Sequence, residues 1–89
     1  MKIRAVLEIN SIKVLMYLLE NGNARYSELL SDLIPSRSTL ALTLRCLQDD
    51  QLIERNVKAS RPVQTWYTLT STGREVAEHL SAIKKLVSR

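Results

Sequence analysis

The stretch RSTLALTLRCLQDD, residues 37–50, decides the fold because its leucines fit two incompatible secondary structures. Leu40, Leu42 and Leu44 alternate with Ala and Thr, which is the period of a half-buried strand. Leu40, Leu44 and Leu47 are instead spaced four and then three residues apart, which is one face of a helix. The position of Leu42 separates the two interpretations, because it is buried on a strand and faces outward on a helix.

The surrounding residues favour the helix. The segment runs for about twelve residues without glycine or proline, which is long for a strand, and it begins at Ser36, a typical N-cap residue. With 3.6 residues per turn, Leu42 lies about 200° around the helix axis from Leu40. We therefore expect Leu40 in the core and Leu42 on the outer surface.

Apolar spacing predicts three further helices and one hairpin. The first helix precedes the stop signal Asn21-Gly22-Asn23 and is expected to bury Ile12, Leu15, Met16 and Leu19. The second covers residues 26–33, with Ser27 as its N-cap, Leu29, Leu30 and Leu33 as its apolar face, and Pro35 after its end. Residues 51–57 and 63–70 predict two strands around a basic loop. The last helix covers residues 71–89, capped by Thr70 or by Thr72 in a capping box with Glu75. The predicted order is α-α-α-β-β-α, mainly α with a small β-hairpin, in a single domain of residues 1–89.

The positive charge is concentrated in two parts of the chain. The 89 residues have a formal charge of +4 and a pI of about 9.6. Residues 33–48 contain Arg37 and Arg45 and no acid, and residues 55–74 contain four basic residues and no acid. Two acid-free basic stretches in one small domain indicate an electropositive surface that could meet nucleic acid.

Several other classes of protein find no support in the sequence. Cys46 is the only cysteine, so no intrachain disulfide or cysteine metal site is expected. Neither paired carboxylates, a nucleophile with a base, nor a phosphate loop is present, so we expect neither an enzyme nor a cofactor. No segment reaches membrane-spanning length and the start is interrupted by polar residues, so we expect a cytoplasmic protein.

Two stretches carry a resemblance to a known family: YSELLSDLIPSRSTLALTLRCLQDDQLIER, residues 26–55, and RPVQTWYTLTSTGREV, residues 61–76. They resemble the winged helix-turn-helix regulators of the HxlR and MarR type. The matching positions are Tyr26, Glu28, Leu29, Leu40, Leu44, Arg45, Leu47, Leu52, Ile53, Arg55, Tyr67, Leu69, Thr70 and Gly73. The chain departs from the pattern at Gln51, where the family usually has Gly, and it lacks the N-terminal Cys-Pro element of many HxlR-type members. The resemblance implies a dimeric, DNA-binding transcriptional regulator.

On this interpretation residues 36–50 form the recognition helix and residues 56–63 form the wing. Arg can read guanine, Ser and Thr can bond to bases or phosphates, and Ala or Leu can contact a thymine methyl group. The wing cations suit phosphates or the minor groove. The expected DNA contacts are Ser36, Arg37, Ser38, Thr39, Ala41, Leu42, Thr43, Arg45, Lys58 and Arg61.

The last helix is expected to hold two copies of the chain together. Val76, Ala77 and Leu80 are expected to pack on the domain itself, and Lys84 and Lys85 flank the residues beyond them as in a coiled-coil seam. The expected homodimer interface consists of Leu80, Ile83, Leu86 and Val87, with a contribution from residues 3–9. A monomer with a self-packed last helix is the alternative.

Two other functions stay open at this stage. A winged helix can serve as a protein-interaction module in a larger complex, or bind nucleic acid with little sequence preference. Cys46 is either an oxidation sensor or a packed side chain. His79 is expected at the surface or in an interface, without a metal. Trp66, which alternates with Tyr67, is expected to pack under a helix, and the alternative is that it lines an interface or a small pocket.

Overall fold

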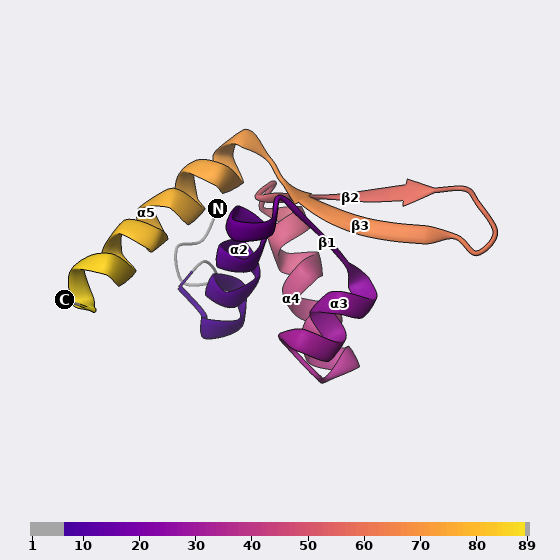
Figure 1. Cartoon of the computed structure of the whole chain (residues 1–89), viewed down its shortest axis with the longest axis horizontal. Helices are drawn as coiled ribbons and strands as arrows, with labels where there is room; N and C mark the ends of the chain where they lie inside the picture. The colour runs from indigo at the N-terminus through magenta and orange to yellow at the C-terminus, as the bar shows by residue number, and fades with distance from the viewer. Residues whose placement is uncertain (1–6, 89) are drawn as a thin grey trace.

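The computed structural model describes residues 7–88, and its elements follow the predicted order with one addition (Figure 1). A short strand lies between the first two helices, so the fold combines α-helices with a three-stranded sheet rather than a two-stranded hairpin alone. The elements are α2 (Ile9–Asn21), β1 (Asn23–Arg25), α3 (Tyr26–Asp32), α4 (Arg37–Asp49), β2 (Ile53–Lys58), β3 (Gln64–Leu69) and α5 (Ser71–Val87).

The sheet is antiparallel, in the order β1-β3-β2, and β3 is its central strand. Strand β1 pairs Ala24 with Tyr67, and β2 pairs Arg55 with the same tyrosine. Ala24 and Tyr67 are buried, so this side of the sheet covers the core. Beyond the core β2 and β3 continue as a long hairpin, which extends to one end of the molecule (Figure 1).

The leucine-rich stretch that fitted either a strand or a helix forms helix α4, as predicted. Ser36 caps α4, its Oγ accepting a hydrogen bond of 3.3 Å from the Thr39 amide. Leu40 is fully buried, whereas Leu42 is 64% exposed. The helical phase is therefore confirmed at the residue that separates it from a strand.

The turn after α4 keeps a glycine-type geometry without a glycine. Gln51 has φ 58°, in the left-handed region, and its amide donates to the Gln48 carbonyl at 2.9 Å. The Leu52 amide donates to the Leu47 carbonyl, also at 2.9 Å. These two bonds form a Schellman motif, and the buried Leu47 and Leu52 supply its usual apolar contact. Gln51 accepts backbone strain at the position where glycine is most favourable.

The start of α5 is fixed against this same turn. Thr70 caps the helix by accepting a 2.9 Å hydrogen bond from the Gly73 amide, and its hydroxyl donates to the Gln51 carbonyl at 2.7 Å. The Thr70 amide donates to the Leu52 carbonyl at 3.1 Å. Of the two caps considered from sequence, Thr70 is the one used.

Two local predictions about the first helices are wrong. In α2 the buried side chains are Ser11, Val14, Leu15 and Leu18, so the core-facing stripe is shifted from the predicted one. The helix is apolar on more than one face, and its spacing alone leaves the phase ambiguous. Helix α3 begins before Ser27, with Arg25 as the N-cap, because the Glu28 side chain accepts the Arg25 amide hydrogen at 3.1 Å.

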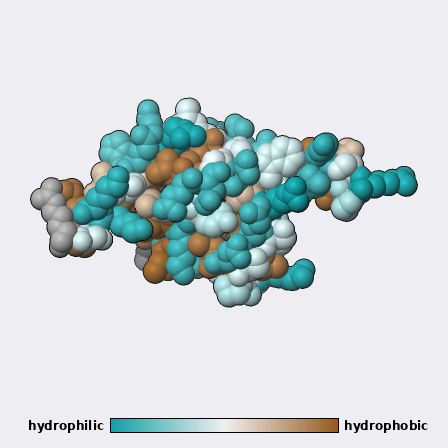
Figure 2. Space-filling view, viewed as in Figure 1, coloured by the Kyte–Doolittle hydropathy of each residue, from teal (hydrophilic) through white to brown (hydrophobic). Residues whose placement is uncertain are grey.

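Helix α5 is only partly supported by the rest of the domain. Ala77 is buried, and Val76 and Leu80 pack against the core, as expected. The helix then continues away from the body of the protein toward the end opposite the hairpin (Figure 1). The space-filling view shows hydrophobic surface near that end and in the middle of the molecule, whereas the far end of the hairpin is mainly hydrophilic (Figure 2).

Candidate nucleic-acid interface

Helix α4 brings most of the predicted contact residues to one surface. Arg37, Ser38, Ala41, Leu42 and Arg45 are all exposed, while Leu40, Leu44 and Leu47 on the opposite side are at most 2% exposed. The buried leucines hold the helix against the core, so its outward side chains have a fixed orientation. This surface, the α4 outer face, offers two guanidinium groups, a hydroxyl and two apolar contacts.

The remaining predicted residues of α4 are less available. Ser36 is exposed but its hydroxyl serves as the helix cap, and Thr39 is half-buried. Thr43 is only 8% exposed, and its hydroxyl donates to the Thr39 carbonyl at 2.8 Å. The structure therefore places Thr43, which was expected to contact DNA, on the buried side of α4 and apart from its outer face.

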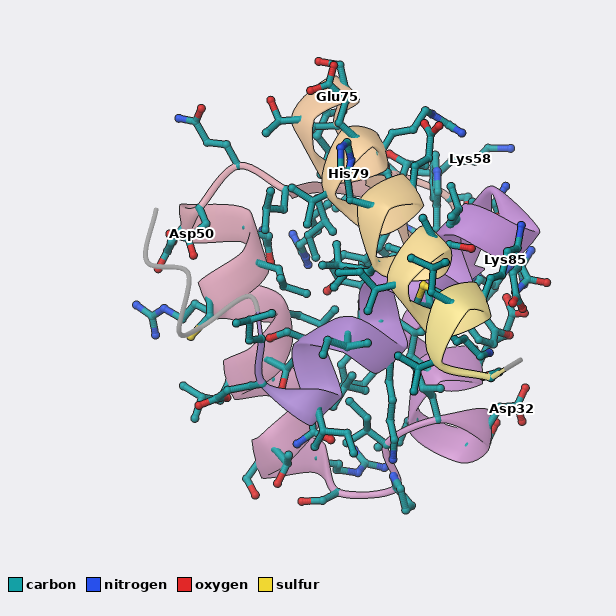
Figure 3. The ribbon with its side chains drawn as sticks, turned by 90° about the vertical axis from the view of Figure 1, so that its left-hand side faces the viewer. Asp32, Asp50, Lys58, Glu75, His79 and Lys85 are labelled. Carbon is teal, nitrogen blue, oxygen red and sulfur yellow. The ribbon has the colours of Figure 1, made fainter. Side chains whose placement is uncertain are left out.

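Charge is distributed unevenly along α4. The helix contains no acid between its start and Asp49, so no carboxylate of α4 itself lies beside the two arginines, and a carboxylate from another segment, Glu8, lines a hollow with Leu42. Asp49 and Asp50 are at its C-terminal end. Figure 3 shows Asp50 at that end of the helix and Asp32, on α3, on the other side of the molecule. The N-terminal two-thirds of the outer face is therefore the part suited to an anionic partner.

Two carboxylates of α3 influence the pKa of Tyr17, which lies on α2 and away from the α4 outer face. Burial raises the pKa of Tyr17 above its usual value, and the nearby carboxylates of Glu28 and Asp32 raise it further. A phenol with its ordinary pKa of about 10 is already neutral at physiological pH, so this shift does not change the charge of Tyr17. This α2–α3 region is acidic and does not extend the positive surface of α4.

Lys58 and Arg61 lie on the hairpin, separate from α4, and both are exposed. The loop between the strands is braced internally, since the Ser60 hydroxyl donates to the Pro62 carbonyl at 2.8 Å and the Ser60 amide donates to the Lys58 carbonyl at 2.9 Å. Such a loop presents its cations at the end of a projecting arm.

Trp66 does not pack under a helix, which was the first expectation, and instead lines a small hollow, which was the alternative prediction. Tyr67 is the aromatic residue that packs in the core, at 5% exposure, and Trp66 lies on the other side of the sheet, where it lines a shallow hollow with Arg25 of β1. Sequence reasoning missed Arg25 as a candidate because a three-residue strand has no recognisable alternation.

Two smaller candidates give no site of their own. Cys46 is a free, half-buried thiol in a hollow of about 300 Å³ between α4 and the start of α2. His79 is exposed on α5 with its Nδ1 2.8 Å from the Glu75 carbonyl oxygen, and Figure 3 shows both side chains on the outer surface of that helix. Among residues 7–88, no group of His, Cys, Asp and Glu side chains could hold a metal ion.

The expected interface residues of α5 differ in exposure. Leu80 is half-buried against the domain's own core, while Ile83, Leu86 and Val87 are 55%, 60% and 80% exposed. At the start of α2, Leu7 and Ile9 are exposed as well. The expected contribution of residues 3–6 lies outside the described residues.

Within the part of the chain that the structure describes, no helix is long and apolar enough to cross a membrane.

A helix-turn-helix, formed by α3 and α4, followed by a projecting hairpin defines a winged helix-turn-helix. This is the architecture of a large class of transcriptional regulators. The model of the HxlR-like helix-turn-helix family matches residues 11–89, so the chain belongs to that family of regulators. The family likeness seen in the sequence is thereby confirmed.

Solved structures of other proteins have the same fold. HlyU from Vibrio cholerae is 29% identical with a TM-score of 0.77, covering 98% of this chain and 88% of its own. The reduced form of the transcriptional regulator YodB from B. subtilis is 25% identical with a TM-score of 0.74, covering 93% and 81%. A transcriptional regulator homologue from Pyrococcus horikoshii is 19% identical with a TM-score of 0.84, covering 98% and 88%. No curated protein matches the chain significantly.

Proposed function

We propose that this protein regulates transcription as a homodimer that binds a specific sequence of double-stranded DNA. The observation that carries the proposal is the α4 outer face, where Arg37 and Arg45 flank an exposed leucine on a helix held rigidly by its buried side. A large apolar side chain on a purely solvated surface gains nothing, whereas beside two arginines it suits a major groove lined by thymine methyl groups.

The rest of the fold supports the same arrangement. Helix α4 enters the major groove with its N-terminal part, which is its positive end, and the hairpin lies beside it on the DNA backbone or in the adjacent minor groove. Lys58 and Arg61 contact phosphates there, so they contribute affinity and salt dependence more than sequence preference.

Replacing Arg45 with alanine tests sequence reading directly. We expect Arg45→Ala to weaken binding to the preferred duplex, selected from random duplexes, by about 1–3 kcal/mol and to flatten the preference at one base pair. The fold should be unaffected because Arg45 is exposed. Fluorescence anisotropy with labelled duplexes at several salt concentrations measures both effects.

Arg74→Ala is the matched control, because it removes the same charge from an exposed position on α5. It should change affinity only slightly and equally for all sequences. If Arg45→Ala and Arg37→Ala both bind like the control, the outer face does not read DNA, and a protein-interaction module becomes the better explanation. A uniform loss for every duplex would indicate a non-specific architectural binder.

The homodimer rests on the apolar side chains at the end of α5. Ile83, Leu86 and Val87 form one exposed stripe beyond the part of the helix that packs on the domain, and an apolar stripe of this kind is favoured when a second copy covers it. A twofold dimer would place two α4 helices in successive major grooves about one helical turn apart.

Introducing a charge into this stripe should dissociate the dimer. We expect Leu86→Asp to sediment as a monomer at micromolar concentration where the unmodified protein sediments as a dimer, because a buried unpaired carboxylate is strongly unfavourable. Lys85→Asp is the control, since Lys85 lies about 200° from Ile83 around the helix axis and outside the stripe. An unmodified protein that is already monomeric would rule out the proposed interface.

A further inference from the structure

The side of the sheet that faces away from the core carries an aromatic and basic surface that shares only Lys58 with the proposed duplex binding. Residues paired in an antiparallel sheet point to the same side, and neighbours along a strand point to opposite sides. Trp66 pairs with Arg25 on one flank and with Asn56 on the other, and Gln64 pairs with Lys58. These side chains therefore share one side, opposite the buried Tyr67.

These residues surround a real depression. A hollow of about 230 Å³ is lined by Asn23, Arg25, Lys58, Gln64 and Trp66. Trp66 is half-buried on the central strand, with its partner Arg25 beside it on β1 and, on β2, Lys58 diagonally across, two residues beyond its partner Asn56. No carboxylate of the described residues lines the hollow, since the acid on this side of the sheet, Glu54, lines a different one.

The chemistry of this surface matches one kind of partner. An indole face accepts a flat ring by stacking, and two flanking cations accept negative charges that lie on either side of that ring. A single-stranded nucleic acid has this pattern, a base between two phosphates. We propose that this side of the sheet binds single-stranded nucleic acid, with one base stacked on Trp66 and the adjoining phosphates on Arg25 and Lys58.

The shape of the hollow favours single-stranded nucleic acid over an enclosed small molecule as its ligand. Small-molecule pockets usually have volumes of about 300–1,000 Å³ and surround most of the ligand. The hollow here is smaller and open, which suits one base on a surface with the backbone continuing past it. Polar neighbours support the base at its edges: Asn23 and Gln64 offer amide groups, and the Asn56 amide is held by the Thr68 hydroxyl at 3.2 Å.

Trp66 also reports on its own occupancy, because it is the only tryptophan in the chain. Titration of the full-length protein with hexathymidylate should quench tryptophan fluorescence to saturation, since the stacked base lies directly on the indole. A duplex containing the same strand should quench much less, because its bases are already stacked on one another. Absence of quenching by the single strand would overturn the proposal.

Variants then separate stacking from general attraction to a positively charged protein. With labelled hexathymidylate, Trp66→Leu should weaken binding by about ten-fold and Arg25→Ala by about three-fold or more. The control, Arg74→Ala, should change it less than either. Equal losses in Arg25→Ala and Arg74→Ala would show that the strand binds by net charge alone and would refute the site. Circular dichroism confirms that Trp66→Leu remains folded.

Two further measurements distinguish this proposal from duplex binding and from the binding of a small molecule. Lys58 belongs to both proposed surfaces, so the tests use Arg25 and Trp66, and Arg25→Ala should bind the preferred duplex normally. Failure of the single-strand titration leaves that duplex measurement unaffected. Thymidine monophosphate should quench far more weakly than hexathymidylate. Equal affinity for thymidine monophosphate and hexathymidylate would mean that the hollow is a small-molecule site. That result would overturn the proposal that it binds single-stranded nucleic acid.

Discussion

Gly73→Ala should destabilise the protein by about 3 kcal/mol or more, because an added methyl group has no room. A Cβ at this position would overlap the Leu52 carbonyl oxygen and come within 2.8 Å of the carbonyl carbon. Both are backbone atoms, so no side-chain rotation relieves the overlap, and α5 must move away from the turn after α4. The free energy of unfolding from urea denaturation measures the loss.

The direction of this effect is informative because helix propensity predicts the opposite. In an exposed helix, alanine is more favourable than glycine by about 1 kcal/mol. Gly73 is buried inside the first turn of α5, so the close approach to Leu52 outweighs propensity. Ser71→Ala, at an exposed position of the same turn, is the control and should stay within about 0.5 kcal/mol of the unmodified protein. A Gly73→Ala variant of normal stability would contradict the close packing seen here.

Moving α5 would also disturb the proposed DNA-binding surface and the proposed dimer interface. Thr70 joins the end of β3 to the turn after α4 through its bonds to Gln51 and Leu52. The hairpin, α4 and α5 therefore meet at a single point. Displacement of α5 weakens the support of the hairpin and redirects the apolar end of the helix, so Gly73→Ala is expected to reduce DNA binding and dimer formation together.

The sequence predicted the elements that have a clear apolar period and a clear cap. Helix α4 has both, with Ser36 at its start and leucines spaced four and three apart, and the hairpin has two β-rich segments around a polar loop. Helix α2 has an end signal at Gly22 but apolar residues on several faces, so its buried stripe was misassigned. Strand β1 is three residues long and depends on pairing with the distant strand β3. Tertiary contacts of this kind leave no local pattern.

The candidate site was predicted to a similar extent. The outer face of α4 followed from helical spacing, and the same spacing could have excluded Thr43, which lies three residues after Leu40 and four before Leu47. Trp66 and Tyr67 were known to face opposite sides, but composition gave no indication of which one faces the core. The register with Ala24 and Arg25 decides it, and this register exists only once β1 has formed.

Leu40 and Leu42 give the most direct experiment on α4, because the same substitution two residues apart should have opposite consequences. Leu40→Ala should cost about 2–5 kcal/mol of stability, since it removes a fully buried side chain from the core. Leu42→Ala should stay within about 0.5 kcal/mol, since that side chain is 64% exposed. Urea denaturation of both variants under identical conditions measures the difference.

For DNA binding we expect the opposite order: the substitution at Leu42 should change sequence discrimination, and the substitution at Leu40 should not. Leu42→Ala keeps the fold but removes an apolar contact to a thymine methyl group, so discrimination at one T·A pair of the preferred duplex should fall. Leu40→Ala should retain that discrimination under conditions where it is folded, because its side chain points into the core. A Leu42→Ala variant with unchanged sequence preference would make Leu42 an incidental exposed residue. A Leu42→Ala variant that unfolds while Leu40→Ala does not would contradict the helix, and with it the winged-helix surface on which the proposed function depends.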